Sequence, residues 1–375
     1  MKIIYNIAAT YNSGGMERVL ANKVNWLVCN GYEVSVITTD QGDRNSFFVF
    51  DRRVKFYDLG INYEENNGKS FLNKLIHYPF KQWKHRRALR ILLSELKADV
   101  VVSMFCNDAT ILPEINDGSS KVLEIHFSRF KRQQYGREGI WKIADYMRSR
   151  NDLKVVSKFR RFVVLTEEDK NYWGNLDNIQ VIPNARSFEF DVPARLEEKK
   201  VIAVGRYCYQ KALDRLIDAW GIVCESVDDW KLYLVGDGED RDALQKQIDK
   251  LGLHDRVVLG RAETDIQSIY AGASMLALSS RYEGLPMVLL EAQAAGLPIV
   301  AFECKCGPKD IVSDGIDGFL IKEGDVVSLA NRMLELINNK DLRKNMGQEA
   351  FKNSERFSEE RVMAQWVNLF KEVVE

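Results

Sequence analysis

Short, apolar, β-branched-rich segments alternate along this chain with longer stretches of helical periodicity. In the first half, the apolar segments are residues 2–9, 33–39, 54–59, 99–104, 121–127 and 162–166. After Ile182-Pro183-Asn184 the same pattern restarts with residues 200–204, 231–235, 257–260, 275–278, 298–301 and 319–321. Strands that alternate with helices favour a parallel sheet covered by helices on its faces.

The repetition predicts an α/β protein with two doubly wound domains. A chain of 375 residues fits this number, since domains average roughly 150 residues. We place an N-terminal domain at residues 1–185 and a C-terminal domain at residues 186–375, and expect the last helix to pack back on the N-terminal domain. The formal net charge is +7 up to residue 190 and −8 after it, which suggests different partners for the two halves.

Composition narrows the class of protein further. Hydrophobic residues make up 46% and charged residues 29% of the chain, which is typical of globular domains and not of disordered chains. The six cysteines are too sparse for a disulfide scaffold, so we interpret them as reduced thiols. No apolar run approaches the ~18 residues of a membrane span, and the start does not resemble a signal peptide. We therefore expect a cytoplasmic protein.

Ligands of open α/β sheets bind beyond the carboxyl ends of the strands, and the most informative segment there is residues 280–296. Pro286 suits the first position of a helix, and the helix that it starts is almost wholly apolar. Glu291 and Gln293 point about 200° apart on this helix, so at least one of them faces inward. A buried carboxylate without a partner costs several kcal/mol, and we expect a ligand or a cation at Glu291.

A second carboxylate, Glu283, precedes this helix. It lies beside a helix N-terminus, where free N–H groups can bind phosphate. Two carboxylates around an anion site suit a ligand with hydroxyls on both sides of a diphosphate, such as a nucleotide sugar. From the pattern alone, a core helix with an internally paired Glu291 and an incidental surface Glu283 is an equal alternative.

Glu283 and Glu291 form a Glu-x7-Glu motif that resembles that of the retaining family 4 glycosyltransferases of the GT-B fold. The resemblance covers nearly the whole chain, through Gly14-Gly15-Met16-Glu17-Arg18, Leu165-Thr166-Glu167-Glu168-Asp169, Val181-Ile182-Pro183-Asn184, Gly205-Arg206, Gln210-Lys211, Val235-Gly236-Asp237-Gly238 and Gly315-x-x-Gly318. Each segment alone is weak, but their order and spacing are specific. The resemblance implies two Rossmann-like domains that face each other across a cleft, with a nucleotide sugar held mainly by the C-terminal domain.

Arg206 and Lys211 follow the first strand of the C-terminal domain. Two cations there could hold a diphosphate and stabilise the charge that develops as it leaves, and the resemblance gives them this role. A pair of solvated loop charges is the alternative. The family has Gln-Lys-Gly where this chain has Ala212 as the third residue, which leaves the loop conformation open.

The resemblance also assigns the remaining donor contacts. Glu283 would orient the sugar hydroxyls and Glu291 the ribose, with the donor also bound by Gly284, Leu285 and Pro286.

In the N-terminal domain the candidates are His126, Gly14 and Gly15. His126 ends the segment 121–127, and the resemblance places it in the cleft near the reacting carbon of the donor sugar. A satisfied structural histidine is the alternative. Gly14 and Gly15 would let the backbone approach the donor diphosphate, although a plain tight turn would also explain them.

Three other patterns are poor site signals. Gly236-Asp237-Gly238 lacks the third glycine of a dinucleotide-binding motif, because Arg241 stands there. Asp240 and Asp242 open a helix, where acidic residues are favoured in any case. The pair Cys304 and Cys306 has the wrong spacing for zinc, and the role of its loop stays open. We expect no cofactor and no metal, as in the resembling family.

The resemblance implies a retaining glycosyltransferase that moves a hexose-type sugar from a nucleotide diphosphate to an acceptor hydroxyl. We favour UDP, the commonest donor type in the resembling group. The acceptor would be a glycan or a lipid-linked glycan of cell-envelope polysaccharide synthesis. The alternatives are a non-hydrolysing nucleotide-sugar epimerase and a non-catalytic nucleotide-sugar-binding protein.

Two basic segments bear on the location of the acceptor. Residues 69–97 carry eight cations against the single acid Glu95, and residues 129–161 carry eleven cations against three acids, with aromatic residues among them. Such segments suit the surface of an anionic membrane, so we expect peripheral binding at the inner face. A solvated helix face, or an acidic glycan as acceptor, is the alternative, and we expect no nucleic-acid partner.

Overall fold

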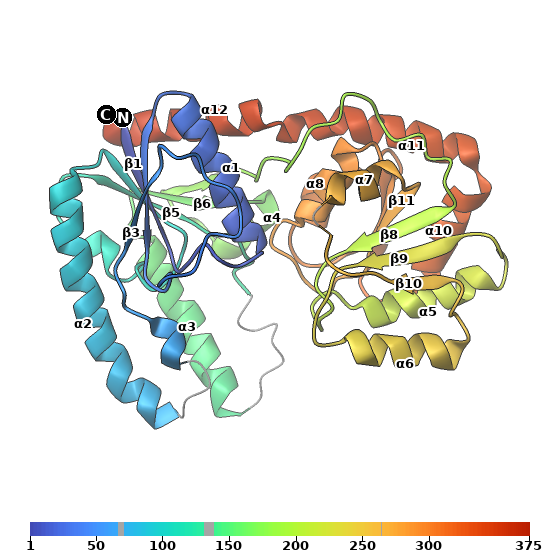
Figure 1. Ribbon diagram of the computed structural model, residues 1–375, viewed down its shortest axis with the longest axis horizontal. Coiled ribbons are helices and arrows are strands. Elements are labelled where there is room, and N and C mark those ends of the chain that lie inside the picture. The colour runs from blue at the N-terminus through green and yellow to red at the C-terminus, as the bar shows by residue number, and fades with distance from the viewer. Residues whose placement is uncertain (67–70, 131–138, 264) are drawn as a thin grey trace. The chain divides into compact units, whose positions relative to one another are not determined.

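The structure is a computed structural model that describes residues 1–66, 71–130, 139–263 and 265–375, and the chain divides into two compact units (Figure 1). Unit 1 consists of Met1–Pro183 and Val362–Glu375, and unit 2 of Asn184–Arg361. The chain therefore changes unit two residues before the predicted boundary, and its last residues belong to unit 1.

Unit 1 is built on a parallel sheet with the strand order β3-β2-β1-β4-β5-β6-β7 among the described residues. Its strands are β1 (Lys2–Ile7), β2 (Glu33–Thr38), β3 (Lys55–Asp58), β4 (Val100–Ser103), β5 (Ser120–Glu124), β6 (Arg161–Val164) and β7 (Ile179–Val181). Its helices are α1 (Gly15–Cys29), α2 (Phe71–Leu96), α3 (Ile140–Val156), α4 (Glu167–Trp173) and most of α12 (Glu359–Val374), with short 3₁₀ turns η1 (Tyr63–Asn66) and η2 (Leu112–Glu114). The edge strand β7 is the one that the apolar pattern does not predict, because its three residues are half-buried.

Unit 2 repeats this plan with the strand order β10-β9-β8-β11-β12-β13, again all parallel. Its strands are β8 (Lys200–Val204), β9 (Lys231–Val235), β10 (Val257–Leu259), β11 (Met275–Leu278), β12 (Ile299–Glu303) and β13 (Gly318–Lys322). Its helices are α5 (Leu213–Cys224), α6 (Arg241–Leu251), α7 (Ile266–Ala271), α8 (Met287–Ala294), α9 (Pro308–Ile311), α10 (Val326–Asn338) and α11 (Lys340–Asn353), followed by the 3₁₀ turn η4 (Ser354–Phe357).

Helices cover both faces of the sheet in unit 1. Leu89 and Leu93 of α2 pack with Val156 of α3 against alternate residues of the central strands, in one buried cluster. Because successive side chains of a strand point to opposite faces, Tyr5 of β1 faces the other side, where α1 buries Lys23 against its ring at 5.8 Å.

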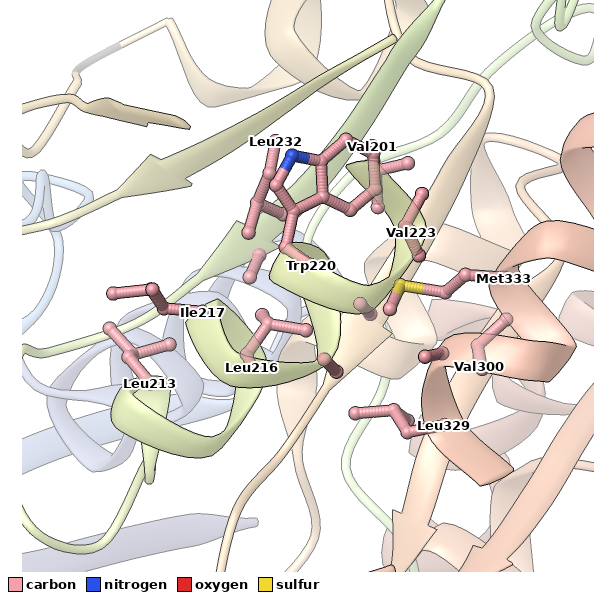
Figure 2. Close-up of a cluster of buried hydrophobic side chains, with 14 of the residues drawn as sticks. Val201, Leu213, Leu216, Ile217, Trp220, Val223, Leu232, Val300, Leu329 and Met333 are labelled. Carbon is pink, nitrogen blue, oxygen red and sulfur yellow. The ribbon is translucent and has the colours of Figure 1, made fainter. Parts of the chain in front are cut away.

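The core of unit 2 forms around Trp220 of α5, which is fully buried. Figure 2 shows this ring beside Val201 and Leu232 of the sheet, with Met333 of α10 packing nearby. In Figure 1, α5 and α6 lie on one face of the sheet, whereas α7 and α8 lie on the other. Both faces of these strands are therefore buried, which explains their nearly continuous apolar sequence.

The strand order determines where each unit can bind a ligand. The chain builds the sheet outward in one direction from β1 and β8, and then in the other direction from β4 and β11. At such a reversal the loops that follow the two central strands diverge and leave the strand ends accessible. In unit 2 these are the loops after β8 and β11, which carry Arg206, Lys211 and Glu283.

Glycines let two neighbouring loops approach closely in unit 2. A Cβ atom on Gly236 would lie 1.9 Å from the backbone oxygen of Gly205, and one on Gly238 would lie 2.3 Å from the backbone oxygen of Tyr207. The loops after β8 and β9 are also joined by a backbone hydrogen bond of 2.9 Å from Tyr207 N to Asp237 O. The glycine motif therefore serves packing between loops.

No helix in the described part of the chain combines the length and the apolar character needed to cross a bilayer.

We predict that Gly236→Ala lowers the free energy of unfolding by about 3 kcal/mol, because the loop after β8 must move to make room for the methyl group. Urea denaturation followed by circular dichroism measures this change. Gly221→Ala is the matched control. A Cβ atom at Gly221, inside α5, has nothing within 4 Å, so alanine should stabilise by about 1 kcal/mol. Equal effects of the two substitutions would contradict the packing role.

Candidate functional site

The candidate site of unit 2 is centred on the carboxylate of Glu283, which is 7% exposed in the loop between β11 and α8. Its Oε1 accepts hydrogen bonds from Lys211 Nζ at 2.7 Å and from Ser280 Oγ at 2.6 Å. The side chain of Lys211 is itself 16% exposed. Burying a carboxylate to this extent is costly without a charged partner, and Lys211 provides one.

Several hydrogen bonds hold the loops after β8 and β11 together. Gln210 Nε2 donates to the backbone oxygen of Tyr282 at 3.0 Å and lies 3.4 Å from Glu283 Oε2. The backbone N–H of Arg281 donates to Gln210 O at 2.8 Å, and its guanidinium lies 4.2 Å from the centre of the Tyr209 ring. These hydrogen bonds join the two loops into one layer of polar groups. The structure thus brings together the predicted residues Lys211 and Glu283.

Ala212 keeps the backbone conformation that a glycine would adopt without strain. Its φ and ψ are 49° and 43°, in the left-handed region, which costs roughly 1–2 kcal/mol for a residue with a Cβ atom. Alanine at this position therefore strains the loop that carries Lys211.

The loop of Cys304 and Cys306 lies directly against the candidate site. The backbone N–H of Glu283 donates to Lys305 O at 3.0 Å, and both cysteines are buried. A Cβ atom on Gly307 would lie 2.4 Å from Pro286 Cδ, so glycine is required for this close approach. The loop supports the segment that carries Glu283.

Helix α8 begins one residue later than predicted. Pro286 has a ψ of 102° and caps the helix from outside, and Met287 is the first helical residue. The backbone N–H groups of Met287 and Val288 have no hydrogen-bond acceptor within the described residues. They are the groups that an anion could use. Gly284 and Leu285 complete the turn between Glu283 and this helix.

Glu291 and Gln293 are both buried inside α8, at 5% and 0% exposure. Glu291 accepts hydrogen bonds from Ser187 Oγ at 2.9 Å and from Tyr270 OH at 2.7 Å. Gln293 donates to Ile311 O and to Asp317 Oδ2, each at 2.9 Å. The prediction that at least one of the two faces inward is confirmed. Protein hydroxyl groups thus lie beside the Glu291 carboxylate where the sequence suggests a ligand or a cation, as in the internally paired alternative.

Arg206 differs from Lys211, although both follow β8. Its side chain is exposed, and among the described residues it has no hydrogen bond or ion pair. It is a cation on the same loop as Lys211 that is free to pair with an incoming anion.

Gly14 and Gly15 lie in unit 1, after β1 and at the start of α1. Gly14 is the N-cap of α1, and a Cβ atom there would lie 2.3 Å from Glu17 Oε2, whereas one on Gly15 would meet nothing within 4 Å. The space at Gly14 is therefore used by the flexible side chain of Glu17, and the space at Gly15 is open.

His126 lies two residues beyond the end of β5, and not within the strand as the sequence predicts. Its Nε2 is 2.5 Å from Glu124 Oε1, and its Nδ1 is buried with no hydrogen-bond partner among the described residues. Glu124 Oε2 accepts a hydrogen bond of 2.6 Å from Lys23 Nζ. The apolar stripe of α1 contains this lysine, since Lys23 falls three residues after Leu20 and next to Val24. A cation on such a stripe is the sequence signal for a buried ion pair.

The partners of the carboxylates are the residues that sequence reasoning misses. Ser187 and Tyr270 come from segments far from Glu291 in sequence, and no motif links them. Gln210 belongs to a segment of the family resemblance but has no predicted role of its own. In the described ranges, no group of three or more His, Cys, Asp and Glu side chains is placed to hold a metal ion.

Comparison with known proteins confirms the fold class and a resemblance to glycosyltransferases. Residues 185–353 match the family described as glycosyl transferases group 1. Over the whole chain, the fold is similar to that of Staphylococcus aureus TarM, solved as a mutant in complex with fondaparinux, α-GlcNAc-glycerol and UDP. The TM-score is 0.78 at 18% identity, over 98% of this chain and 99% of that one. The two Rossmann-like α/β units are those of a GT-B fold.

Two of the relatives match over nearly their full lengths. An uncharacterized glycosyltransferase of Haemophilus influenzae is 28% identical over 374 residues, which cover 97% of this chain and 98% of that protein. The second relative, from Campylobacter jejuni, is GalNAc-α-(1→4)-GalNAc-α-(1→3)-diNAcBac-PP-undecaprenol α-1,4-N-acetyl-D-galactosaminyltransferase. It is 28% identical over 382 residues, which cover 100% of this chain and 99% of that protein.

Proposed function

Because residues 185–353 match the glycosyl transferases group 1, we propose that the chain is a retaining glycosyltransferase that transfers a hexose-type sugar from a UDP-sugar to an acceptor hydroxyl. The observation that carries the proposal is the Lys211–Glu283 pair beside the free Arg206 and the N-terminus of α8. This arrangement offers cations and N–H groups for a diphosphate, and a carboxylate for sugar hydroxyls, within neighbouring loops of one sheet edge.

The proposed reaction keeps the configuration at the sugar carbon. The bond from this carbon to the diphosphate breaks, and a bond to the acceptor oxygen forms on the same face. The acceptor proton passes to the leaving phosphate oxygen. Arg206 and Lys211 stabilise the charge on the leaving group, so the chemistry needs neither a protein nucleophile nor a metal.

The two carboxylates bind different parts of the proposed donor. Glu283 accepts hydrogen bonds from the sugar hydroxyls and Glu291 from the ribose. Glu291 already accepts two hydroxyl hydrogen bonds, from Ser187 and Tyr270, so its carboxylate is held in an orientation that suits such donors. In unit 1, His126, Gly14 and Gly15 are the proposed contacts to the donor.

The Campylobacter jejuni relative is named for a reaction on an undecaprenol-linked glycan, and the Staphylococcus aureus structure was solved with UDP. These names favour a lipid-linked or cell-envelope glycan as acceptor and UDP as the nucleotide of the donor. A thermal-shift screen against UDP-hexoses tests the donor directly, because a ligand at 100 times its Kd stabilises by about 2.7 kcal/mol. Turnover of a UDP-sugar without any acceptor would instead favour an epimerase.

We predict that Glu283→Gln abolishes transfer and leaves the thermal unfolding midpoint within a few degrees of wild type. Glutamine preserves the volume and can still accept from Ser280, but it removes the charge that faces the donor. UDP release in the presence of a UDP-hexose panel and a lipid-linked glycan extract measures transfer. The isosteric control is Glu335→Gln on α10, whose carboxylate pairs with Arg332 on the surface. Wild-type turnover in a folded Glu283→Gln protein would remove this residue from the site.

We predict that Arg206→Ala lowers kcat on the order of 10²-fold, the usual scale for losing one preorganised charge stabiliser. Arg195→Ala is the matched control, because Arg195 is also exposed but precedes β8 at the opposite edge of the sheet. An increase confined to KM would mean that Arg206 binds the donor equally in ground and transition states. That result would contradict its role in stabilising the leaving group.

We predict that EDTA leaves the rate of transfer unchanged, because the proposed site uses cationic side chains where a metal would otherwise hold the diphosphate. The measurement compares initial rates before and after chelation and dialysis. A rate that falls with EDTA and returns with Mn²⁺ or Mg²⁺ would be incompatible with the proposed chemistry.

An exposed aromatic and basic surface on α2 supports peripheral membrane binding. Phe80 is 64% and Trp83 is 56% exposed, and their rings stack at a centroid distance of 6.0 Å. Arg87 lies 5.8 Å from the Trp83 ring. Exposed aromatic rings beside cations suit the interface of an anionic bilayer. Of the predicted basic residues, Lys69, Lys131, Arg132 and Arg137 lie outside the described part of the chain.

We predict that the protein sediments with vesicles of phosphatidylglycerol and phosphatidylcholine at low salt and is released at high salt, because salt screens the attraction. Neutralising Lys84, Arg86, Arg87 and Arg90 together should weaken this binding at least tenfold, since each cation contributes up to about 1 kcal/mol. The control neutralises the surface cations Arg332, Lys340, Lys344 and Lys352 of α10 and α11. A wild-type protein that stays in the supernatant at low salt would refute membrane binding and favour a soluble acceptor.

A further inference from the structure

A buried row of hydrogen-bonded side chains in unit 1 consists of Lys23, Glu124 and His126. Lys23 of α1 is 5% exposed and Glu124 of β5 is 1% exposed. Lys23 Nζ lies 2.6 Å from Glu124 Oε2, and the other carboxylate oxygen, Oε1, lies 2.5 Å from His126 Nε2. One carboxylate thus bridges the ammonium group and the imidazole ring.

Glu124 is ionised in this arrangement. Burial by itself would raise the pKa of its carboxyl group, but the Lys23 ammonium and the hydrogen bond from His126 outweigh burial and lower the pKa below its usual value. Burial lowers the pKa of the Lys23 ammonium, and the Glu124 carboxylate counteracts this effect. The pair therefore exists as carboxylate and ammonium, each needing the other in a site that excludes water.

An ionised Glu124 determines which ring nitrogen of His126 carries the proton. Both oxygens of a carboxylate are acceptors, so a contact of 2.5 Å to Nε2 requires a hydrogen on Nε2. In the neutral ring the other nitrogen, Nδ1, then has a free lone pair. This Nδ1 is buried and has no hydrogen-bond partner in the described ranges. In the neutral ring it is therefore an acceptor that no described protein group satisfies.

The C-terminal helix, α12, also contacts this row of side chains. Lys23 Nζ lies 3.7 Å from the centre of the Trp366 ring of α12 and 5.8 Å from that of Tyr5. Trp366 is 2% exposed. A cation over an indole face is stabilised by the ring when it is desolvated, and the ring also excludes water from the ion pair. Trp366 of α12 thus fixes the position of the Lys23 side chain.

We propose that Lys23 and Glu124 are positioning residues that keep the proton of His126 on Nε2, so that Nδ1 accepts a hydrogen bond from a hydroxyl of the bound sugar substrate. This inference rests on the proposed function for the identity of the hydroxyl. The titratable groups that the structure places against Glu124 are Lys23 from α1, Tyr5 from β1 and His126 after β5. Tyr5 is fully buried, and burial and the nearby Glu124 raise the pKa of its hydroxyl, so it stays neutral throughout the range in which an imidazole titrates.

The ring can be observed directly by NMR, because the chain has four histidines. Long-range ¹H–¹⁵N correlation spectra distinguish the two neutral tautomers, and His126→Asn assigns the signals. We expect the Nε2–H tautomer in the full-length wild-type protein, without any ligand. An Nδ1–H tautomer or an even mixture would overturn the proposal, whether or not the protein is a glycosyltransferase.

Two single substitutions should weaken the tautomer preference of His126 to different extents. Glu124→Gln replaces the carboxylate by an amide that can donate as well as accept, so the preference for Nε2–H should be lost. Lys23→Met leaves the carboxylate beside Nε2 and removes only the group that positions it, so the preference should weaken without disappearing. A general packing defect would affect both variants alike. An unchanged tautomer in Glu124→Gln would overturn the role assigned to the carboxylate.

A double substitution guards against misfolding of the single variants. Lys23→Met with Glu124→Leu replaces the buried pair by apolar side chains of similar volume, which proteins often tolerate without loss of stability. In this variant we expect an unfolding midpoint near that of wild type and loss of the tautomer preference of His126. Retention of the Nε2–H tautomer would show that another group sets it.

Enzyme kinetics then test the link to the substrate. In Glu124→Gln the kcat/KM of transfer should fall as the tautomer preference is lost, because a ring with its hydrogen on Nδ1 cannot accept there. An unchanged kcat/KM in a variant that has lost the preference would overturn the substrate contact and leave the tautomer assignment standing. Absence of any transfer in the wild-type protein would refute the proposed function and leave the NMR results valid.

Discussion

The rest of the candidate site depends on the burial of the Glu283 carboxylate at the edge of a parallel sheet. A buried charge must be paired, and the partner, Lys211, comes from the loop after a different strand. That pairing, with Ser280 and Gln210, ties the loops after β8 and β11 into one layer. Arg206 lies on the first of these loops, and the N-terminus of α8 follows the second, so the layer sets the positions of both. A donor that binds here replaces water at groups that are already oriented, which is the basis of electrostatic catalysis.

Unit 1 uses the same principle for another purpose. Lys23 and Glu124 are buried together, and Trp366 shields them from water. The pair holds an imidazole ring whose second nitrogen is left without a partner among the described residues. In both units, then, a buried carboxylate is held by a lysine from a neighbouring element and orients polar groups at the carboxyl edge of the sheet. The two sites differ in that Lys211 is partly exposed, whereas Lys23 is enclosed.

The sequence predicts the fold well, because buried parallel strands require continuous apolar segments and their helices require a periodic apolar face. It misses β7, a short edge strand with little buried surface, and it starts α8 one residue early at Pro286. For the site, the motifs select Lys211 and Glu283 for separate roles, and the structure shows that the two side chains form a hydrogen bond. It does not reveal Ser187 or Tyr270, because hydrogen bonds between distant segments leave no periodic signal. The strained backbone of Ala212 is likewise a property of the folded loop, which the residue type alone does not reveal.

A nucleotide diphosphate bound as proposed would contact the loops after β8 and β11. Hydrogen–deuterium exchange of the full-length protein, with and without saturating UDP, reports the location of binding without any acceptor. We expect slower exchange in residues 205–212 and 283–290, at the backbone N–H groups beside Arg206 and at the start of α8. Saturable binding of UDP that leaves exchange in both segments unchanged would show that the nucleotide binds elsewhere.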